Sequence, residues 1–329
     1  MLSGFSFALS TWCCVAIAQP VTATLPWIRI GADSADHTDF NQHIKYVETI
    51  FPDPSAPIPY PEASNITVGA KYYTLASHLP PGTHVIWGVN FGSDNVTAAF
   101  LEARAIKTAF DSDTLAGKSI TLEAIEIGNE PDIYGFTGHR DPATWTIEEY
   151  VKEWTTFAKN VAIAAGRRWS ILCGGGVFLW DSKFFRRSLI NQISQHRYSG
   201  NVGATASIPS LMSKATIRAN LSLLINDINV VHAKELGYIL GETNNYFEHG
   251  EPGVSNTAGA AIRIIDYTLY AASINIDDVS GLIWAGQSFE TEDCWPIGAA
   301  VTETLNVVNQ SITTSISATE AILLTPGLQ

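Results

Sequence analysis

Two glutamates that directly follow short apolar runs carry the chemistry that this sequence indicates. Glu130 comes after the run Leu122–Gly128, within the sequence IGNEP, and Glu242 comes after Tyr238–Gly241. Paired carboxyl groups can cleave a glycosidic bond, because the leaving oxygen needs a proton and the anomeric carbon needs a nucleophile or a base. Such a pair works when its surroundings hold the two pKa values apart. We therefore predict that Glu130 and Glu242 are the catalytic carboxylates of a glycoside hydrolase.

Each glutamate also has a simpler interpretation. Asn, Gly and Pro are turn formers, so Glu130 within the sequence GNEP fits an ordinary turn. Glu242 fits a helix cap or a salt-bridge partner. Two strand-end glutamates in similar settings are harder to explain in this way, and the coincidence favours catalysis. The polar residues after Glu242, including Asn244, and the aromatic Tyr246 predict a sugar-facing loop.

The elements that must position these residues are apolar and helical segments that alternate along the chain. Nearly continuous apolar runs predict strands covered on both faces; they are Trp27–Ala32, His84–Phe91, Leu122–Gly128, Ser170–Val177, Tyr238–Gly241 and Gly281–Gln287, with a weaker candidate at Gln195–Tyr198. Helical patterns lie between several of them, at Thr97–Ala109, Thr146–Ala165 and Asn256–Ala272. This alternation predicts a parallel α/β fold and favours a (β/α)8 barrel of the TIM type. In such a barrel, catalytic side chains stand at the carboxyl ends of the strands.

Four segments resemble glycoside hydrolase family 79, which includes β-glucuronidases and heparanase. They are WIRIGADSAD at 27–36, EIGNEP at 126–131, HRY at 196–198 and LGETN at 240–244. The likeness covers roughly residues 25–290. It implies a retaining (β/α)8 barrel in which Glu130 is the acid/base after the fourth strand and Glu242 is the nucleophile after the seventh.

The resemblance also implies residues that bind the substrate. Asn129 is expected to hydrogen-bond the sugar 2-hydroxyl, a contact that strengthens in the transition state. His196 matches a family histidine near the nucleophile, and Tyr246 is expected to contact the carboxylate of a uronic acid. Together with Asn244, these residues form the predicted site for an oligo- or polysaccharide that contains glucuronic acid.

The chain departs from the family pattern at several points. The sequence Gly31-Ala32-Asp33 stands where members have Gly-Gly-Asn, and the added carboxylate of Asp33 is expected to repel a uronate and to raise the pKa values of nearby acids. The sequence WAGQ at 284–287 lacks the histidine of an aromatic-His-Gln stretch. The chain is also short at both ends, so we expect a truncated relative with an incomplete barrel and without the family's C-terminal β-sandwich.

The two ends of the chain set the predicted domain boundaries. Residues 1–18 are apolar and close with Ala16-Ile17-Ala18, which predicts a cleaved signal peptide; alternatively, this segment stays and serves as the first strand. We assign residues 19–300 to the catalytic barrel and residues 301–329 to a C-terminal tail. Four N-glycosylation sequons favour secretion, at Asn65, Asn95, Asn220 and Asn309.

Composition and absent motifs argue against several other functions. A net charge of −13 without a Lys/Arg cluster opposes binding to nucleic acids or anionic lipids. No apolar stretch of the sequence is long enough for a membrane span. The sequence lacks C-x-x-C, H-E-x-x-H, P-loop and G-x-S-x-G motifs, so we predict no metal, no cofactor and no serine nucleophile. We expect Asp36, His37, Asp39 and His43 to form a hydrogen-bonded loop, and Cys173 and Cys294 to be free thiols.

Two alternatives to the main hypothesis of a secreted, monomeric β-glucuronidase-like hydrolase stay open. A retaining β-glycosidase of the same clan that takes a neutral sugar would use the same two carboxylates. A truncated, non-catalytic carbohydrate-binding relative would keep the fold but not the turnover. The sequence also leaves open whether cleavage is exo or endo.

Overall fold

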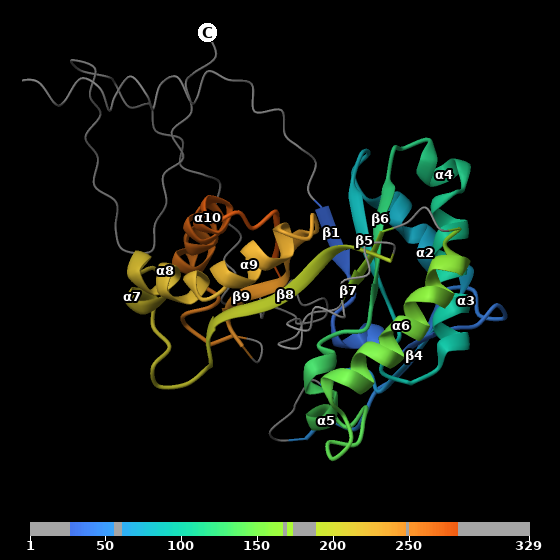
Figure 1. Cartoon of the computed structure of the whole chain (residues 1–329), viewed down its shortest axis with the longest axis horizontal. Helices are drawn as coiled ribbons and strands as arrows, with labels where there is room; N and C mark the ends of the chain where they lie inside the picture. Colours follow the sequence, from blue (N-terminus) through green and yellow to red (C-terminus); the bar gives the residue numbers. More distant parts are fainter. Residues whose placement is uncertain (1–26, 56–60, 167–169, 174–188, 248–249, 282–329) are drawn as a thin grey trace, which may run out of the picture.

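The main feature of the molecule is a seven-stranded parallel sheet (Figure 1). The computed structural model describes residues 27–55, 61–166, 170–173, 189–247 and 250–281. In sheet order the strands are β1 (Trp27–Ile30), β5 (His84–Val89), β6 (Thr121–Ile127), β7 (Ser170–Cys173), β8 (Ile190–Gly200), β9 (Gly237–Tyr246) and β10 (Asp278–Gly281). Every hydrogen-bonded pair of neighbours is parallel. Because the sheet order follows the chain order, the sheet is wound in one direction, as in a barrel and unlike an open doubly wound sheet.

Helices lie along the outside of this sheet. The longer ones are α3 (Val96–Phe110), α6 (Ile147–Ala164), α8 (Lys214–Ser222), α9 (Ile225–His232) and α10 (Ala258–Ser273). In Figure 1, α3 and α6 lie beside β5 and β6, and α8, α9 and α10 lie with β8 and β9. The shorter helices are α2 (Ala70–Tyr73), α4 (Asp113–Ala116), α5 (Tyr134–Thr137) and α7 (Ile208–Leu211), with 3-10 turns η1 (Asp33–His37), η2 (Thr74–His78) and η3 (Pro131–Ile133).

The sequence of α6 explains why this segment is helical. The side chain of Thr146 accepts a hydrogen bond from the Glu149 amide and so caps the first turn. Apolar side chains repeat at helical spacing and are buried, namely Tyr150, Trp154, Phe157, Ala158 and Val161. This buried stripe is the one that the sequence predicts, and it fixes which face of α6 meets the core.

The two faces of the sheet carry different side chains, as the alternation along a strand requires. Val85 of β5 belongs to the large core beneath the helices, whereas Ile86 packs with Ala124 and Ile239 on the inner face. Trp27 packs against this inner cluster, although β1 and β9 are not neighbours in the sheet. Cα atoms of β1 and β10 also come within 8 Å of each other. The described part of the sheet is therefore strongly curved around its inner side chains.

Two parts of the fold are missing from the sequence prediction. A second sheet has the order β2 (Thr38–Phe40), β4 (Asn65–Val68), β3 (Val47–Ile50). Its strands have three or four residues, and β3 is exposed along its whole length, so none of them forms an apolar run. The helices α7, α8 and α9 were also not predicted. Conversely, the weak strand candidate Gln195–Tyr198 is the centre of the eleven-residue strand β8.

Several sequence predictions concern residues outside the described ranges. They are the signal peptide at 1–18, the tail at 301–329, the WAGQ segment, Cys294 and the sequon at Asn309. Among the described residues, no helix is both long enough and apolar enough to cross a membrane.

The remaining three sequons differ in their surroundings. Asn65 is the exposed first residue of β4, and Asn95 is an exposed cap of α3. Asn220 on α8 is half-buried, and its Nδ2 donates a 3.0 Å hydrogen bond to the Tyr198 carbonyl of β8. Two of these sites are therefore open to a glycan, and the third is engaged in packing.

Candidate active site

Glu130 stands at the carboxyl end of β6, after a sharp change of chain direction. Its backbone is left-handed, with φ 47° and ψ 52°, which is uncommon for a residue with a Cβ. Gly128 also has a positive φ of 78°, and a Cβ at this position would lie 2.7 Å from the Tyr134 hydroxyl. Glycine is therefore required there, and the turn exposes the Glu130 carboxyl group beyond the strand.

Glu242 lies within β9 and directly follows a bulge in this strand, at Gly241. The register between β8 and β9 shifts between Gln195 and His196, so that His196 pairs with Glu242. A bulge of this kind changes the direction of the side chains that follow it. Tyr198, two residues further along β8, points to the same site as His196 and donates a 2.6 Å hydrogen bond to Glu242 Oε1.

The two predicted catalytic glutamates meet at His196. Its Nδ1 lies 2.9 Å from Glu130 Oε1 and 3.9 Å from Glu242 Oε2. One carboxylate oxygen of each glutamate and one imidazole nitrogen all lie within 4.8 Å of one another. Retaining glycosidases hold their carboxyl groups about 5–5.5 Å apart, whereas inverting ones need roughly 6.5–9.5 Å to admit a water. The spacing here is of the shorter kind.

Arg29 on β1 holds the carboxylates from the inside of the sheet, a role that the sequence prediction missed. Its guanidinium donates from Nη1 to Glu242 Oε2 over 3.1 Å and from Nη2 to Asn129 Oδ1 over 2.9 Å. Its Nε donates to Glu126 of β6. A lone arginine within the apolar run WIRI is a signal that could have identified it, because a buried cation needs anionic partners.

These neighbours set the charge of the nucleophile candidate. Burial opposes ionisation of Glu242, but the positive charges of His196 and Arg29 outweigh it and lower the pKa of Glu242. The hydrogen bond from Tyr198 acts in the same direction. Burial lowers the pKa of His196, but the carboxylates of Glu242 and Glu130 raise it by more, so the net shift is upward. The site therefore favours an ionised Glu242 next to a protonated imidazole.

Asp36 fixes the loops that carry the site. Its buried carboxylate accepts hydrogen bonds from the amides of Phe91, Gly92 and Asn129 and from the Tyr134 hydroxyl, at 2.6–3.1 Å. Burial raises the pKa of Asp36 to about 6, although these donors oppose the shift. One side chain from η1 thus holds the ends of β5 and β6 together. Asp36 is hydrogen-bonded as the sequence predicts for the segment that also contains His37, Asp39 and His43, although Asp39 lies in the strand β2.

The predicted substrate residues have different surroundings. Asn129 and His196 contact the carboxylate pair directly or through Arg29. Asn244 follows Glu242 by two residues, and its Oδ1 accepts from the Asn245 amide. Tyr246 is buried with Leu211 and Ala260, and its hydroxyl bonds to the Ser207 backbone. This packing gives Tyr246 a structural role, and its contact with a sugar stays a prediction.

An acidic and histidine-rich group borders the site. Asp33 Oδ2 lies 3.5 Å from His37 Nε2, and its carboxyl group also hydrogen-bonds Glu62. Burial and the neighbouring Asp33 raise the pKa of Glu62 to about 7, and the charge of Glu242 adds to this shift. The electrostatic link to Glu242 places this group near the carboxylate pair.

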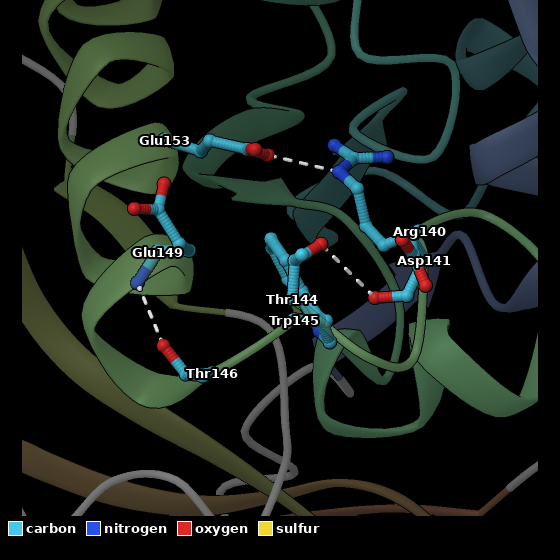
Figure 2. Close-up of a pocket in the computed structure, with 7 residues that line it drawn as sticks. All are labelled: Arg140, Asp141, Thr144, Trp145, Thr146, Glu149 and Glu153. Carbon is cyan, nitrogen blue, oxygen red and sulfur yellow. Dashed lines mark hydrogen bonds and ion pairs between the residues drawn. The ribbon is translucent and has the colours of Figure 1, made fainter.

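A separate cavity of about 420 Å³ is formed by the segment after α5 and the first turns of α6 (Figure 2). It is lined by Arg140, Asp141, Thr144, Trp145, Thr146, Glu149 and Glu153. Arg140 pairs with Glu153 at 2.9 Å and donates to the carbonyls of Phe91, Gly92 and His139. The charge and the N–H groups of Arg140 are thus used within the protein. We therefore assign this cavity to packing and not to catalysis.

In sequence the chain is similar to β-glucuronidases of two fungi. No protein-family model matches the chain. A β-glucuronidase of Neurospora crassa is 27% identical over 291 residues, which are 79% of this chain and 50% of that protein. A β-glucuronidase of Aspergillus niger is 28% identical over 279 residues, which are 76% of this chain and 49% of that protein. The chain is a relative of the β-glucuronidases. The resemblance to glycoside hydrolase family 79 is thereby confirmed.

Solved structures extend the comparison to the fold. A 4-O-α-L-rhamnosyl-β-D-glucuronidase of Fusarium oxysporum superposes with a TM-score of 0.64 at 22% identity, over 83% of this chain and 59% of that one. A family 51 arabinofuranosidase of Xanthomonas axonopodis gives a TM-score of 0.50 at 12% identity, over 79% of this chain and 58% of that one. The fold is therefore the parallel α/β fold of these glycosidases. The present chain spans about half the length of the curated proteins it matches.

Proposed function

We propose that this chain is the catalytic barrel of a retaining, β-glucuronidase-like glycoside hydrolase. Its substrate is an oligo- or polysaccharide of plant or proteoglycan type that contains glucuronic acid. The observation that carries the proposal is the short spacing of the Glu130 and Glu242 carboxylates around His196, within 4.8 Å. The similarity to two β-glucuronidases supports the choice of sugar.

The proposed reaction is a double displacement. Glu242 attacks the anomeric carbon and forms a glycosyl ester while the bond to the leaving oxygen breaks, and Glu130 gives that oxygen its proton. Glu130 then removes a proton from water, the water oxygen attacks the anomeric carbon, and Glu242 leaves as a carboxylate. Arg29 and Tyr198 stabilise Glu242 as an anion before the first step and after the second. Asn129 is the proposed donor or acceptor for the sugar 2-hydroxyl.

The wider setting of the enzyme is part of the same proposal. The chain-order winding and the curvature of the seven described strands support a (β/α)8-type barrel. The exposed sequons at Asn65 and Asn95 support a secreted glycoprotein. A monomeric state and the assignment of residues 1–18 to a signal peptide stay predictions from the sequence.

A neutral sugar is the second candidate substrate, and one observation favours it. Asp33 and Glu62 place two carboxyl groups near Glu242, where they disfavour a second anion on the substrate. Under this alternative the chain is a retaining β-glycosidase that uses the same mechanism on a neutral sugar.

The test is a comparison of p-nitrophenyl β-glycosides, with the glucuronide measured against the glucoside, xyloside and galactoside. We expect the highest kcat/KM for the glucuronide and, with a 2-fluoro glucuronide, a covalent adduct on the peptide that contains Glu242. A neutral glycoside as best substrate, still with an adduct on Glu242, would favour the second candidate. Saturable glycan binding without turnover of any of these would make the chain a non-catalytic relative.

A further inference from the structure

A second group of ligating side chains lies outside the reaction described above. Asp33, His37 and His139 each direct one donor atom to a common point, and these atoms lie within 4.8 Å of one another. The carboxyl group of Glu62 hydrogen-bonds Asp33 and so lies beside these three residues. The four residues come from three separate parts of the chain: η1, the segment before β4 and the segment after α5.

The donor set and its spacing fit a divalent transition metal ion. Two imidazoles and two carboxylates are typical ligands of Zn²⁺, whose donor atoms in a tetrahedral site lie about 3.3 Å apart. The distance from His37 Nε2 to Asp33 Oδ2 is 3.5 Å. The rings of His37 and His139 are 5.2 Å apart and tilted by 41°, so they are not stacked on each other. The other two pairs of donor atoms among Asp33, His37 and His139 are no more than 4.8 Å apart.

The surroundings of His139 resemble those of a metal ligand. Its ring hydrogen-bonds the Gly92 backbone, and a Cβ on Gly92 would lie 2.7 Å from Nδ1. Ligating histidines use such a bond to a carbonyl to fix the ring and the tautomer. The ring also packs on Tyr134, 4.8 Å between centroids, and Tyr134 is itself held by Asp36. The position of His139 is thus fixed from two sides.

The carboxylate pair is a poorer metal site, although Glu130, His196 and Glu242 have a similar spacing. Arg29, with a side chain 4% exposed, already supplies a positive charge to Glu242. A dication at this point would face that guanidinium across a buried space, where like charges repel strongly. In the outer group Arg140 lowers the pKa of His139, but its guanidinium pairs with Glu153 at 2.9 Å, so its charge is partly neutralised.

We propose that Asp33, His37, Glu62 and His139 bind one Zn²⁺ ion that ties the three chain segments together at the edge of the active site. The ion stabilises the native state, because a ligand that binds only the folded protein raises its stability by mass action. Catalysis does not require it, so the site can be tested without any substrate.

The experiment titrates the EDTA-treated full chain with Zn²⁺ by calorimetry at pH 7.5 and with Co²⁺ by visible absorption. We expect one ion per chain, a tetrahedral Co²⁺ spectrum and a higher melting temperature with Zn²⁺. His139→Ala and Asp33→Asn should each weaken Zn²⁺ binding by at least tenfold. His43→Ala, an exposed histidine outside the group, is the matched control and should bind like the parent.

Three results would overturn the proposal. The first is an absence of binding by both titrations, and the second is undiminished affinity in His139→Ala and Asp33→Asn. The third is binding that persists in these variants and is lost in Glu242→Gln, which would move the ion to the carboxylate pair. If His139→Ala unfolds in EDTA, Glu62→Gln on the exposed segment replaces it, and the same tenfold loss is required.

Discussion

Arg29 Nη1 donates to Glu242 Oε2 over 3.1 Å, from the first strand of the sheet to the sixth in sheet order. The contact crosses the inner face of the curved sheet, because β1 and β9 are not hydrogen-bonded neighbours. The same guanidinium reaches Asn129 and Glu126 at the end of β6. One buried cation therefore couples the position of the nucleophile candidate to that of the loop that carries the acid/base candidate.

Removal of the Glu242 carboxylate tests the nucleophile. Glu242→Gln keeps the shape of the side chain but cannot form the glycosyl ester, so we expect kcat/KM to fall to below about one thousandth of the parent value. The measurement is hydrolysis of the best p-nitrophenyl glycoside. Glu148→Gln, an exposed glutamate on α6, should keep full activity. Residual activity near the parent level would reject the assignment.

Glu130→Gln tests the acid/base through the leaving group. Proton donation contributes roughly 10²–10⁴-fold when the leaving oxygen is basic, and little for p-nitrophenolate, which leaves without a proton. We expect a large loss with an unactivated glycan and a smaller loss of glycosylation rate with the aryl glycoside. Azide should restore turnover of the aryl substrate, because it needs no general base. Equal losses on both substrates, without rescue, would contradict this role.

Tyr198→Phe removes the 2.6 Å hydrogen bond to Glu242. That bond lowers the pKa of Glu242, so its loss should raise this pKa and move the acidic limb of the kcat/KM profile to higher pH. Folding should be nearly unchanged, as judged by the melting temperature. Tyr46→Phe, on an exposed ring, is the control. An unshifted acidic limb in Tyr198→Phe would show that this bond does not tune the nucleophile.

Arg29→Met tests the coupling between the strands. The substitution leaves Glu126 and Glu242 buried without their cation, and breaking a buried pair from one side costs about 3–5 kcal/mol. We expect a loss of that size in the free energy of unfolding, measured by urea denaturation, together with loss of activity. Arg104→Met, where the arginine lies over the Phe100 ring on α3, should cost little. If Arg29→Met and Arg104→Met have equal free energies of unfolding, Arg29 does not couple the two strands.

Strands, long helices and the two glutamates were predictable because their signals are local. An apolar run predicts β6, a helical stripe predicts α6, and the residue after a strand is known once the strand is known. Arg29 and Tyr198 escaped prediction as site residues because their partners lie far away along the chain, such as Glu242 for Arg29. The bulge at Gly241 in β9 decides that His196 faces Glu242, and a lone glycine within the strand is only a weak sequence signal of it.

Glu102 on α3 gives the protein a pH-dependent stability that is separate from the site. Burial raises its pKa to about 8, although the Asn90 amide and the Tyr73 hydroxyl bond to the carboxyl group. The folded protein therefore favours the protonated acid, and this contribution is present below pH 4.5 and lost as the pH rises through 8. Relative to Glu102→Gln, the parent should lose on the order of 3 kcal/mol between pH 5 and 9. Parallel stability curves for the two proteins would contradict the shift.

The hydrogen bond from Asn220 to the Tyr198 carbonyl bears on how the protein is best produced. N-linked oligosaccharides are attached to the side-chain nitrogen while the chain is still unfolded, and here that nitrogen must later dock α8 on β8. A modified Asn220 would loosen the strand that carries both His196 and Tyr198. Expression in a host without this modification, or as Asn220→Gln in a host that has it, should thus give the more homogeneous preparation.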